Sequence, residues 1–303
     1  MNDLELKPLP TDYSFEKLFG PNKEYVYFKN VSDHPYHFAS NKFQLVNAWW
    51  LAEASMLVYV KEDNFVKENL AKAGVNNIEF FKKKGTQCFI AHNNDFIIVC
   101  FRGTELEEHD IITDAKFILV DSEQGGKVHK GFKDAIDLVW DDIKEYIQNI
   151  RSNSARKQTV WFTGHSLGAA LAVLAADRCS NVQGVYTFGS PRIGDEDFVN
   201  NYYANTYRFV NNNDVVPMVP PPVLYRHVGL VKYIDSEGHI HDNPQKWYKK
   251  IDQFNAHFSH LINVLGSWKV GAFDAISADN LNDHAPIYYA VKIWNNYIKD
   301  IKS

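Results

Sequence analysis

A serine lies between two glycines in the middle of the chain, in the pentapeptide Gly164-His165-Ser166-Leu167-Gly168. The run before it, Thr159 to Thr163, is rich in β-branched and aromatic residues and predicts a short buried strand. The run after it, Leu167 to Cys179, is rich in alanine and leucine and predicts a buried helix. A serine on such a strand–turn–helix junction has a strained backbone that exposes its hydroxyl, and glycines let the strand and the helix approach closely. The pattern predicts that Ser166 is a nucleophile; the alternative is a serine in an ordinary tight turn.

A serine hydroxyl is a weak nucleophile at neutral pH, so Ser166 needs a general base, and the base needs a carboxylate that orients it. In proteins with a nucleophilic serine on such a strand–turn–helix junction, the acid and then the histidine follow the serine along the chain. The segment "YRFVNNNDVVPMVPPP" supplies the acid, because Asp214 follows a predicted strand at 207–211. We therefore expect Asp214 to orient the base, against the alternative of an Asx-turn residue.

The general base has several candidates after Asp214. They are His227, His239, His241, His257, His260 and His284. His227 lies in a strand-like run and is expected to be packed, whereas His257 and His260 share one predicted helix. His284 lies in "NDHAPIYYAV", at the mouth of the final predicted helix, where a loop can present it. We prefer His284 and leave the other two helical histidines open.

Acyl chemistry at a serine also needs two donors for an oxyanion. The first expected donor is the backbone N–H of Leu167, the residue after the nucleophile. The second must come from a loop after an earlier strand. The segment "FRGTE" leaves the end of a predicted strand at 95–101, so we expect the N–H of Thr104 to point into the site.

Composition limits the class of protein. The chain has 303 residues, 45% of them apolar and 23% charged, with a formal net charge of −5. This composition is typical of a soluble globular protein, and the charge disfavours nucleic acid as a partner. Cys88, Cys100 and Cys179 lie in apolar segments and are expected to be free thiols. The polar, acidic start has no signal-peptide pattern, so we expect a cytoplasmic protein, with export by a leaderless route left open.

Strand and helix patterns alternate along the chain. Helical patterns cover 42–60, 64–74, 131–150, 167–180, about 195–203, 257–268 and 284–300, and strand patterns cover 86–92, 95–101, 159–163, 184–191, 207–211 and 227–234. This alternation predicts an α/β fold with a mostly parallel central sheet and helices on both faces. In such sheets functional residues gather where strands end and helices begin, which is the position of Ser166.

Four segments, "FRGTE", "VHKGF", "TGHSLGAALA" and "YTFGSPRIG…YRFVNNNDVVPMVPPP", together resemble the class 3 lipase family, the fungal-type triacylglycerol lipases of the α/β-hydrolase fold. Their order and spacing match from about residue 45 to 225, and beyond 235 only "DHAPIYY" resembles the family. The resemblance implies the α/β-hydrolase fold. It also implies Ser166 as nucleophile, Asp214 as acid, His284 as base, and oxyanion donors at Thr104 and Leu167.

The resemblance further implies a lid, here at about 105–119, in which apolar and acidic side chains fall on opposite faces of a predicted helix. Such a helix covers an apolar cleft in water and opens at a lipid surface; the alternative is a fixed surface helix. Many members have a tryptophan where this chain has Ile111, and the lid opens with acidic residues, which argues against strong interfacial activation. We expect one domain over 1–303, with an N-terminal extension at about 1–40.

The expected function is a serine carboxylic-ester hydrolase that acts on acyl esters, as a triacylglycerol lipase or esterase, through an acyl-enzyme and without a metal or organic cofactor. The expected partner is a small-molecule or lipid ester, with a transient contact between lid and lipid surface. Alternatives are a phospholipase A-type hydrolase and a non-catalytic binding module on the same fold. A metal site built from "HIHD" and "HFSH" has suitable ligand types but weak spacing.

Overall fold

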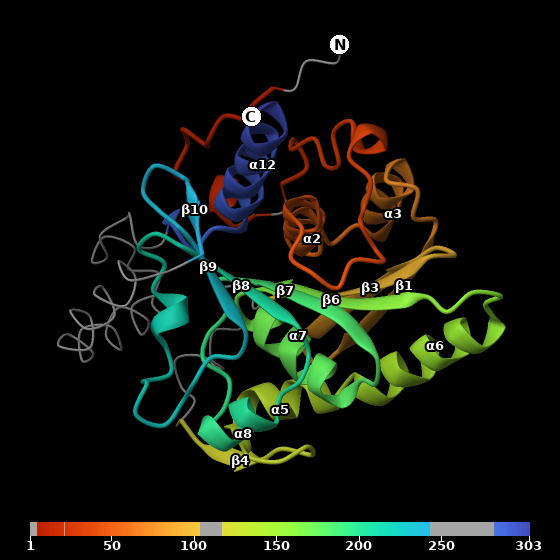
Figure 1. The fold of residues 1–303 in the computed structure, drawn as a ribbon, viewed down its shortest axis with the longest axis vertical. Coiled ribbons are helices and arrows are strands. Elements are labelled where there is room, and N and C mark those ends of the chain that lie inside the picture. The colour runs from red at the N-terminus through yellow and green to blue at the C-terminus, as the bar shows by residue number, and fades with distance from the viewer. Residues whose placement is uncertain (1–4, 21, 104–116, 243–281) are drawn as a thin grey trace.

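The computed structural model describes residues 5–20, 22–103, 117–242 and 282–303. An eight-stranded sheet forms its centre, in the order β1-β2-β3-β6-β7-β8-β9-β10 (Figure 1). The strands are β1 (Asn77–Lys83), β2 (Thr86–His92), β3 (Phe96–Phe101), β6 (Thr159–His165), β7 (Val182–Phe188), β8 (Thr206–Asn211), β9 (Leu230–Ile234) and β10 (Ile240–His241). The central strands β3, β6, β7, β8 and β9 pair in parallel, and the outer strands β1, β2 and β10 pair antiparallel. A separate hairpin joins β4 (Leu119–Asp121) and β5 (Lys127–His129).

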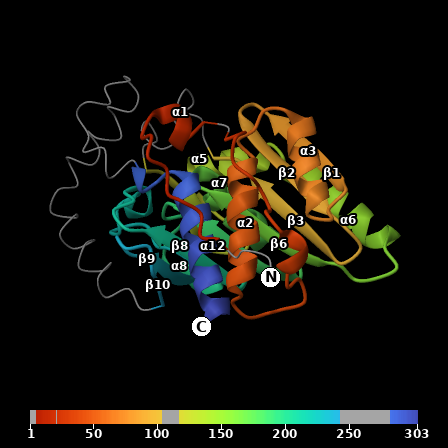
Figure 2. The same cartoon turned by 90° about the horizontal axis from the view of Figure 1, so that it is seen from above.

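Helices cover both faces of the sheet (Figure 1). One face carries α1 (Phe15–Leu18), α2 (Leu45–Leu57), α3 (Asp63–Lys72) and α12 (Pro286–Lys302). The other carries α5 (Lys130–Asp137), α6 (Trp140–Asn153), α7 (Leu167–Arg178) and α8 (Glu196–Asn201). Single 3₁₀ turns, η1 (Val31–Asp33) and η3 (Val216–Met218), complete these elements. Figure 2 shows α2 and α12 side by side over the sheet, with α1 near the end at which α12 begins.

Alternation along the central strands separates the two large apolar clusters of the described core, one on each face of the sheet. In β3, Phe96, Ile98 and Cys100 belong to the cluster under α2 and α12, whereas the residues between and after them belong to the cluster against α5, α6 and α7. Successive side chains of a strand point to opposite faces, so a strand that is apolar throughout is buried on both sides. The predicted α/β fold with a mostly parallel sheet covered on both faces is confirmed.

The amphipathic segment at 131–150 is predicted as one helix, and this prediction is wrong. The chain forms α5 and α6 instead, separated at Leu138 and Val139. The N–H of Val139 donates to the carbonyl of Ile136 at 3.1 Å, a tighter bond than the α-helical one, and the chain turns there. Ile136 before the break, Val139 within it and Trp140 after it are all buried, so the apolar pattern continues through the break and conceals it.

Other expectations are confirmed or fall outside the described residues. The three cysteines are free thiols, and the final helix forms from Pro286 onward. Thr104, most of the lid segment and the predicted helix at 257–268 lie outside the described residues, and Leu119 at the end of the lid segment belongs to β4. No helix in the described ranges has the length and apolar character needed to span a bilayer.

Candidate active site

Ser166 occupies the junction between β6 and α7. Its backbone has φ 58° and ψ −128°, a region that is strained for a residue with a side chain. The residue is the N-cap of α7, and its N–H donates to the carbonyl of Phe188 in the adjacent strand at 2.9 Å. The strained serine expected from the sequence is therefore present, at the carboxyl ends of β6 and β7.

Two glycines make this junction sterically possible. A Cβ placed on Gly164 would lie 2.3 Å from the carbonyl oxygen of Gly168, and one on Gly168 would lie 2.3 Å from the carbonyl oxygen of Phe101. Side chains therefore have no room where the strand, the helix and the end of β3 meet. The predicted close approach is confirmed.

Asp214 and His284 meet at the same edge of the sheet. The Nδ1 atom of His284 lies 2.9 Å from both carboxylate oxygens of Asp214, and both side chains are buried. Asp214 also accepts hydrogen bonds from the backbone N–H of Val216 at 2.9 Å and from the hydroxyl of Tyr289 at 2.5 Å. Hydrogen bonds from these donors offset the free-energy cost of burying the carboxylate and fix its orientation. Burial and the neighbouring carboxylate raise the pKa of Tyr289 well above its usual range, so this hydroxyl stays protonated and remains a donor.

Asn211 links the segment that carries Asp214 to the segment that carries His284. The side-chain amide of Asn211 donates to the backbone carbonyl of Asp283 at 2.8 Å. The buried ammonium of Lys292 donates to the amide oxygen of Asn211 at 2.8 Å. The carboxylate of Asp283 in turn accepts from the backbone N–H of Asn213 at 3.1 Å. Hydrogen bonds between residues 211–213 and Asp283 therefore hold the segment of His284 in place relative to the segment of Asp214.

His165 supports the histidine from the serine side. Its Nε2 lies 2.6 Å from the carbonyl oxygen of His284, and its Nδ1 lies 3.0 Å from the hydroxyl of Tyr59. A carbonyl can only accept, so Nε2 carries the proton and the hydroxyl of Tyr59 donates to Nδ1. Burial, with the nearby His284, holds the pKa of His165 well below its usual range, so the ring stays neutral. Sequence reasoning missed Tyr59, because nothing in the helical pattern of 42–60 distinguishes its hydroxyl.

Of the two expected oxyanion donors, the structure describes Leu167 but not Thr104. Leu167 is the first residue of α7, and the N–H groups in the first turn of a helix have no acceptor within that helix. A Cβ placed on Gly103 would lie 3.3 Å from the Cβ of Ser166, so the loop after β3 reaches the serine. Thr104 follows Gly103 directly but lies outside the described residues.

Three other candidate histidines lie in the described residues and make contacts outside this site: His227, His239 and His241. The Nε2 of His227 bonds to the carbonyl of Pro217 at 2.8 Å, which agrees with the packed position expected for it. His241 of β10 pairs with Asp235, the residue that follows β9, at 2.7 Å. His257 and His260 lie outside the described residues. Within the described ranges no three histidine, cysteine, aspartate or glutamate side chains are grouped so that they could hold a metal ion.

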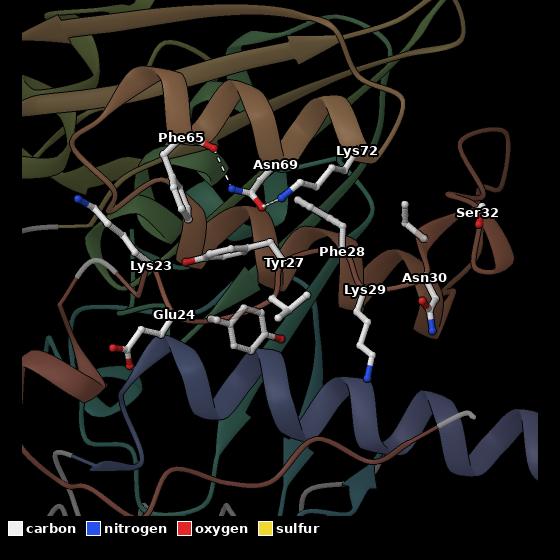
Figure 3. A pocket seen from close by; sticks show the side chains of 13 residues that line it. Lys23, Glu24, Tyr27, Phe28, Lys29, Asn30, Ser32, Phe65, Asn69 and Lys72 are labelled. Atoms are coloured by element: carbon white, nitrogen blue, oxygen red, sulfur yellow. Dashed lines mark hydrogen bonds between the residues drawn. The ribbon is translucent and has the colours of Figure 1, made fainter. Parts of the chain in front are cut away.

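A separate cavity of about 550 Å³ lies away from this site, between residues 23–32 and α3 (Figure 3). Tyr27 and Phe65 form its apolar wall, and Asn69 bonds to the carbonyl of Phe65 at 2.9 Å. Two of its three lysines, Lys23 and Lys29, form ion pairs with Glu62 and Glu5, and the third, Lys72, donates to the side-chain oxygen of Asn69 at 3.2 Å. None of Ser166, Asp214 and His284 lines this cavity.

Several known proteins are similar to this chain over a range that includes Ser166 and Asp214. The sequence profile described as "Lipase (class 3)" matches residues 98–224, which include Ser166 and Asp214. A triacylglycerol lipase of Arabidopsis thaliana, OBL1, is 27% identical over 72% of this chain and 54% of its own length. A secreted mono- and diacylglycerol lipase of Fusarium solani is 33% identical over 51% of this chain and 49% of its own length. The crystal structure of lipase II from Rhizopus niveus has a TM-score of 0.52 and 25% identity, over 62% of this chain and 78% of that one.

The chain thus spans about half the length of the curated relatives that it matches. Their names contradict one expectation from the sequence. The Fusarium protein and several other fungal relatives are named as secreted lipases, which indicates an extracellular location. The expectation of a cytoplasmic protein is therefore wrong; it depended on the composition of the first residues, which shows no export pattern.

Proposed function

Because the chain belongs to the class 3 lipase family of α/β-hydrolases, we propose that it is a serine carboxylic-ester hydrolase that acts on lipid acyl esters. The observation that carries this proposal is the buried pair of Asp214 and His284, whose imidazole packs against His165, the residue before the strained Ser166. The names of the relatives, triacylglycerol lipase and mono- and diacylglycerol lipase, support a glycerol ester as substrate.

In the proposed reaction His284 removes the proton from the hydroxyl of Ser166 as the serine oxygen attacks the ester carbonyl. Asp214 holds the imidazole in the tautomer with a proton on Nδ1 and stabilises the imidazolium that forms. The carbonyl oxygen becomes an oxyanion, and the N–H groups of Leu167 and Thr104 donate to it.

Collapse of the tetrahedral intermediate breaks the bond between the carbonyl carbon and the alcohol oxygen. The imidazolium of His284 gives its proton to that oxygen, and the alcohol leaves. Water then attacks the acyl-enzyme with the same histidine as general base, and the carboxylic acid and free Ser166 are released.

The test of this proposal is hydrolysis of acyl esters from acetate to palmitate, and then of an emulsified long-chain triglyceride and a phospholipid. Ser166→Ala should lower kcat by about 10⁴-fold or more, because no other group supplies the nucleophile. Asp214→Asn should lower kcat severely while Ser166 is still present, since the amide no longer favours the productive tautomer.

Thermal unfolding curves that match the wild type would show that both variants are folded. Retained activity in Ser166→Ala would overturn the proposal. A wild-type rate that rises with acyl length and increases sharply on the emulsion would identify a lipase, and a rate confined to short soluble esters would identify an esterase.

A further inference from the structure

Phe19 brings an aromatic ring from the start of the chain to the proposed general base. Its ring centroid lies 6.3 Å from that of His284, with an angle of 35° between the rings. Phe19 is half-buried and packs against the core cluster under α2 and α12. It follows α1, which Figure 2 shows near the end of α12 that follows His284.

The segment that carries Phe19 is fixed on both sides by one buried carboxylate, Glu53 in α2. The ammonium of Lys7 lies 2.6 Å from Oε1 of Glu53, and the hydroxyl of Tyr25 donates to the same oxygen at 2.7 Å. Oε2 of Glu53 accepts from the backbone N–H of Phe28. Because Lys7 precedes Phe19 in the chain and Tyr25 follows it, both ends of the intervening segment are tethered.

Contacts with α12 reinforce this anchor. The backbone N–H of Lys7 donates to the side-chain oxygen of Asn295 at 2.7 Å, and the amide of Asn295 donates back to the carbonyl of Lys7 at 2.9 Å. Leu18, next to Phe19, is buried in the same core cluster. A side chain held in this way has a defined position relative to His284, as a substrate contact requires.

The position of Phe19 indicates which part of an ester it contacts. The histidine of such a site gives its proton to the departing alcohol, so the alcohol oxygen must lie within hydrogen-bond reach of that imidazole. A ring packed near this imidazole is therefore close to the place that the departing alcohol must occupy. We propose that Phe19 forms an apolar wall of the alcohol subsite and favours esters with apolar alcohols, an inference that rests on the proposed hydrolase function.

The test uses two series of esters that vary one part at a time. The first combines butyrate with methanol, butanol or octanol, and the second combines methanol with acids from butyric to decanoic. Phe19→Ala should lower kcat/KM for octyl butyrate by about 10-fold and change it less than about 2-fold for methyl butyrate, because only the longer alcohol reaches the wall. The preference among acids should stay unchanged.

Phe19→Leu, which keeps an apolar side chain, should recover most of the lost preference. Tyr13→Ala is the matched control, because it removes an exposed ring from the same segment. All butyrates share one butyryl-enzyme, so the effect belongs to the acylation step and should appear in kcat/KM and not in the rate of deacylation.

An equal loss on both series would overturn the proposal, because Phe19 would then only support His284. Unchanged kcat/KM for octyl butyrate in Phe19→Ala would overturn it as well. Labelling of Ser166 by a fluorophosphonate probe separates this failure from that of the proposed function. Wild-type protein that neither reacts with the probe nor hydrolyses any ester would overturn the hydrolase itself.

Discussion

At the scale of single residues, both the ring and the backbone carbonyl of His284 are held by hydrogen bonds. The ring is fixed by Asp214 and the carbonyl by His165, and the hydroxyl of Tyr59 sets the tautomer of His165. A Cβ placed on Gly103 would lie 2.2 Å from that hydroxyl, so Tyr59 also touches the loop expected to bind the oxyanion. The hydroxyl of Tyr59 thus contacts both His165, which holds the proposed base, and Gly103 in the loop expected to bind the oxyanion.

Tyr59→Phe should therefore weaken both stability and turnover. It leaves Nδ1 of the buried His165 without a donor, which costs about 1–3 kcal/mol of unfolding free energy. We expect kcat to fall by less than about 10-fold with KM little changed, because the reacting groups remain present. Urea unfolding and steady-state kinetics on one ester measure both effects.

Tyr36→Phe is the matched control. Its hydroxyl is also buried and has no hydrogen-bond partner within the described residues, so its removal should leave stability and kcat unchanged or slightly raise the stability. Equal losses in the two variants would show that the bond to His165 has no special effect.

The sequence predicted the reacting groups better than their supports. Ser166 and Asp214 carry local signals, the flanking glycines and the order along the chain. The choice of His284 among the candidates depended on its place at the mouth of the last helix. Tyr59 and Tyr289 bond across long separations in the sequence, and a phenol in an apolar helical segment has the same pattern whether or not its hydroxyl is used.

At the scale of elements, the end of α7 carries a carboxyl group in an unfavourable place. Burial raises the pKa of Asp177 to about 6 from 3.8, although the hydroxyl of Ser122 donates to its carboxylate at 3.3 Å. Negative charge near the C-terminus of a helix is also disfavoured by the helix dipole.

The contribution of Asp177 to the stability of the protein should therefore fall as the pH rises from about 4 to 6. In this interval the folded state binds more protons than the unfolded chain, so the unfolding free energy decreases with pH. Allowing for the partial exposure of the group, the loss is about 1–2 kcal/mol. Asp177→Asn should remove this contribution and raise Tm at pH 7.5 by a few degrees, as measured by thermal unfolding at pH 4.5 and 7.5.

Asp137→Asn is the control, because its effect on Tm should be opposite to that of Asp177→Asn. Although Asp137 is partly buried, hydrogen bonds from Lys133 and Arg178 lower its pKa, so its charge stabilises the fold at neutral pH. This variant should lower Tm at pH 7.5. If Asp177→Asn also lowers Tm there, its carboxylate is better accommodated than its burial suggests.

The sequence was less informative at the edge of the sheet. Strand β1 was not predicted, because its residues are mostly exposed and its end is rich in lysine, so the segment lacks the apolar alternation of a half-buried strand. Such charged edge strands protect a sheet from pairing with other chains. The central strands, which are buried on both faces, gave the clearest patterns.

At the scale of the whole molecule, the start of the chain is part of the core. An N-terminal extension at about 1–40 is expected from the sequence. In the structure Tyr27, Phe28 and Tyr36 of this stretch are buried with α2 and α12. This packing joins segments nearly 290 residues apart, such as Lys7 and Asn295, and no local pattern predicts it.

Glu53→Gln should loosen this packing. It leaves the ammonium of Lys7 buried without its counter-charge, and breaking a buried pair in this way costs about 3–5 kcal/mol of unfolding free energy. Hydrogen exchange of the backbone amides of residues 5–30 should speed up more than that of β3 and β6, and urea unfolding measures the total loss.

Glu24→Gln is the control, because it removes one partner of the exposed pair between Lys17 and Glu24 on the same segment and should leave stability unchanged. Similar exchange rates in both variants would show that the carboxylate of Glu53 does not hold the segment.

The anchoring of this segment also involves two indole rings. The Nε1 of Trp294 donates to the backbone carbonyl of Glu5 at 3.0 Å, and that of Trp49 donates to Glu53 at 2.7 Å. Both rings are at most 2% exposed. Release of the first residues would bring these indoles into water and shift their fluorescence to longer wavelength. The chain therefore contains an intrinsic optical reporter of whether its N-terminal segment is docked, and an emission spectrum recorded during ester turnover reads it without any label.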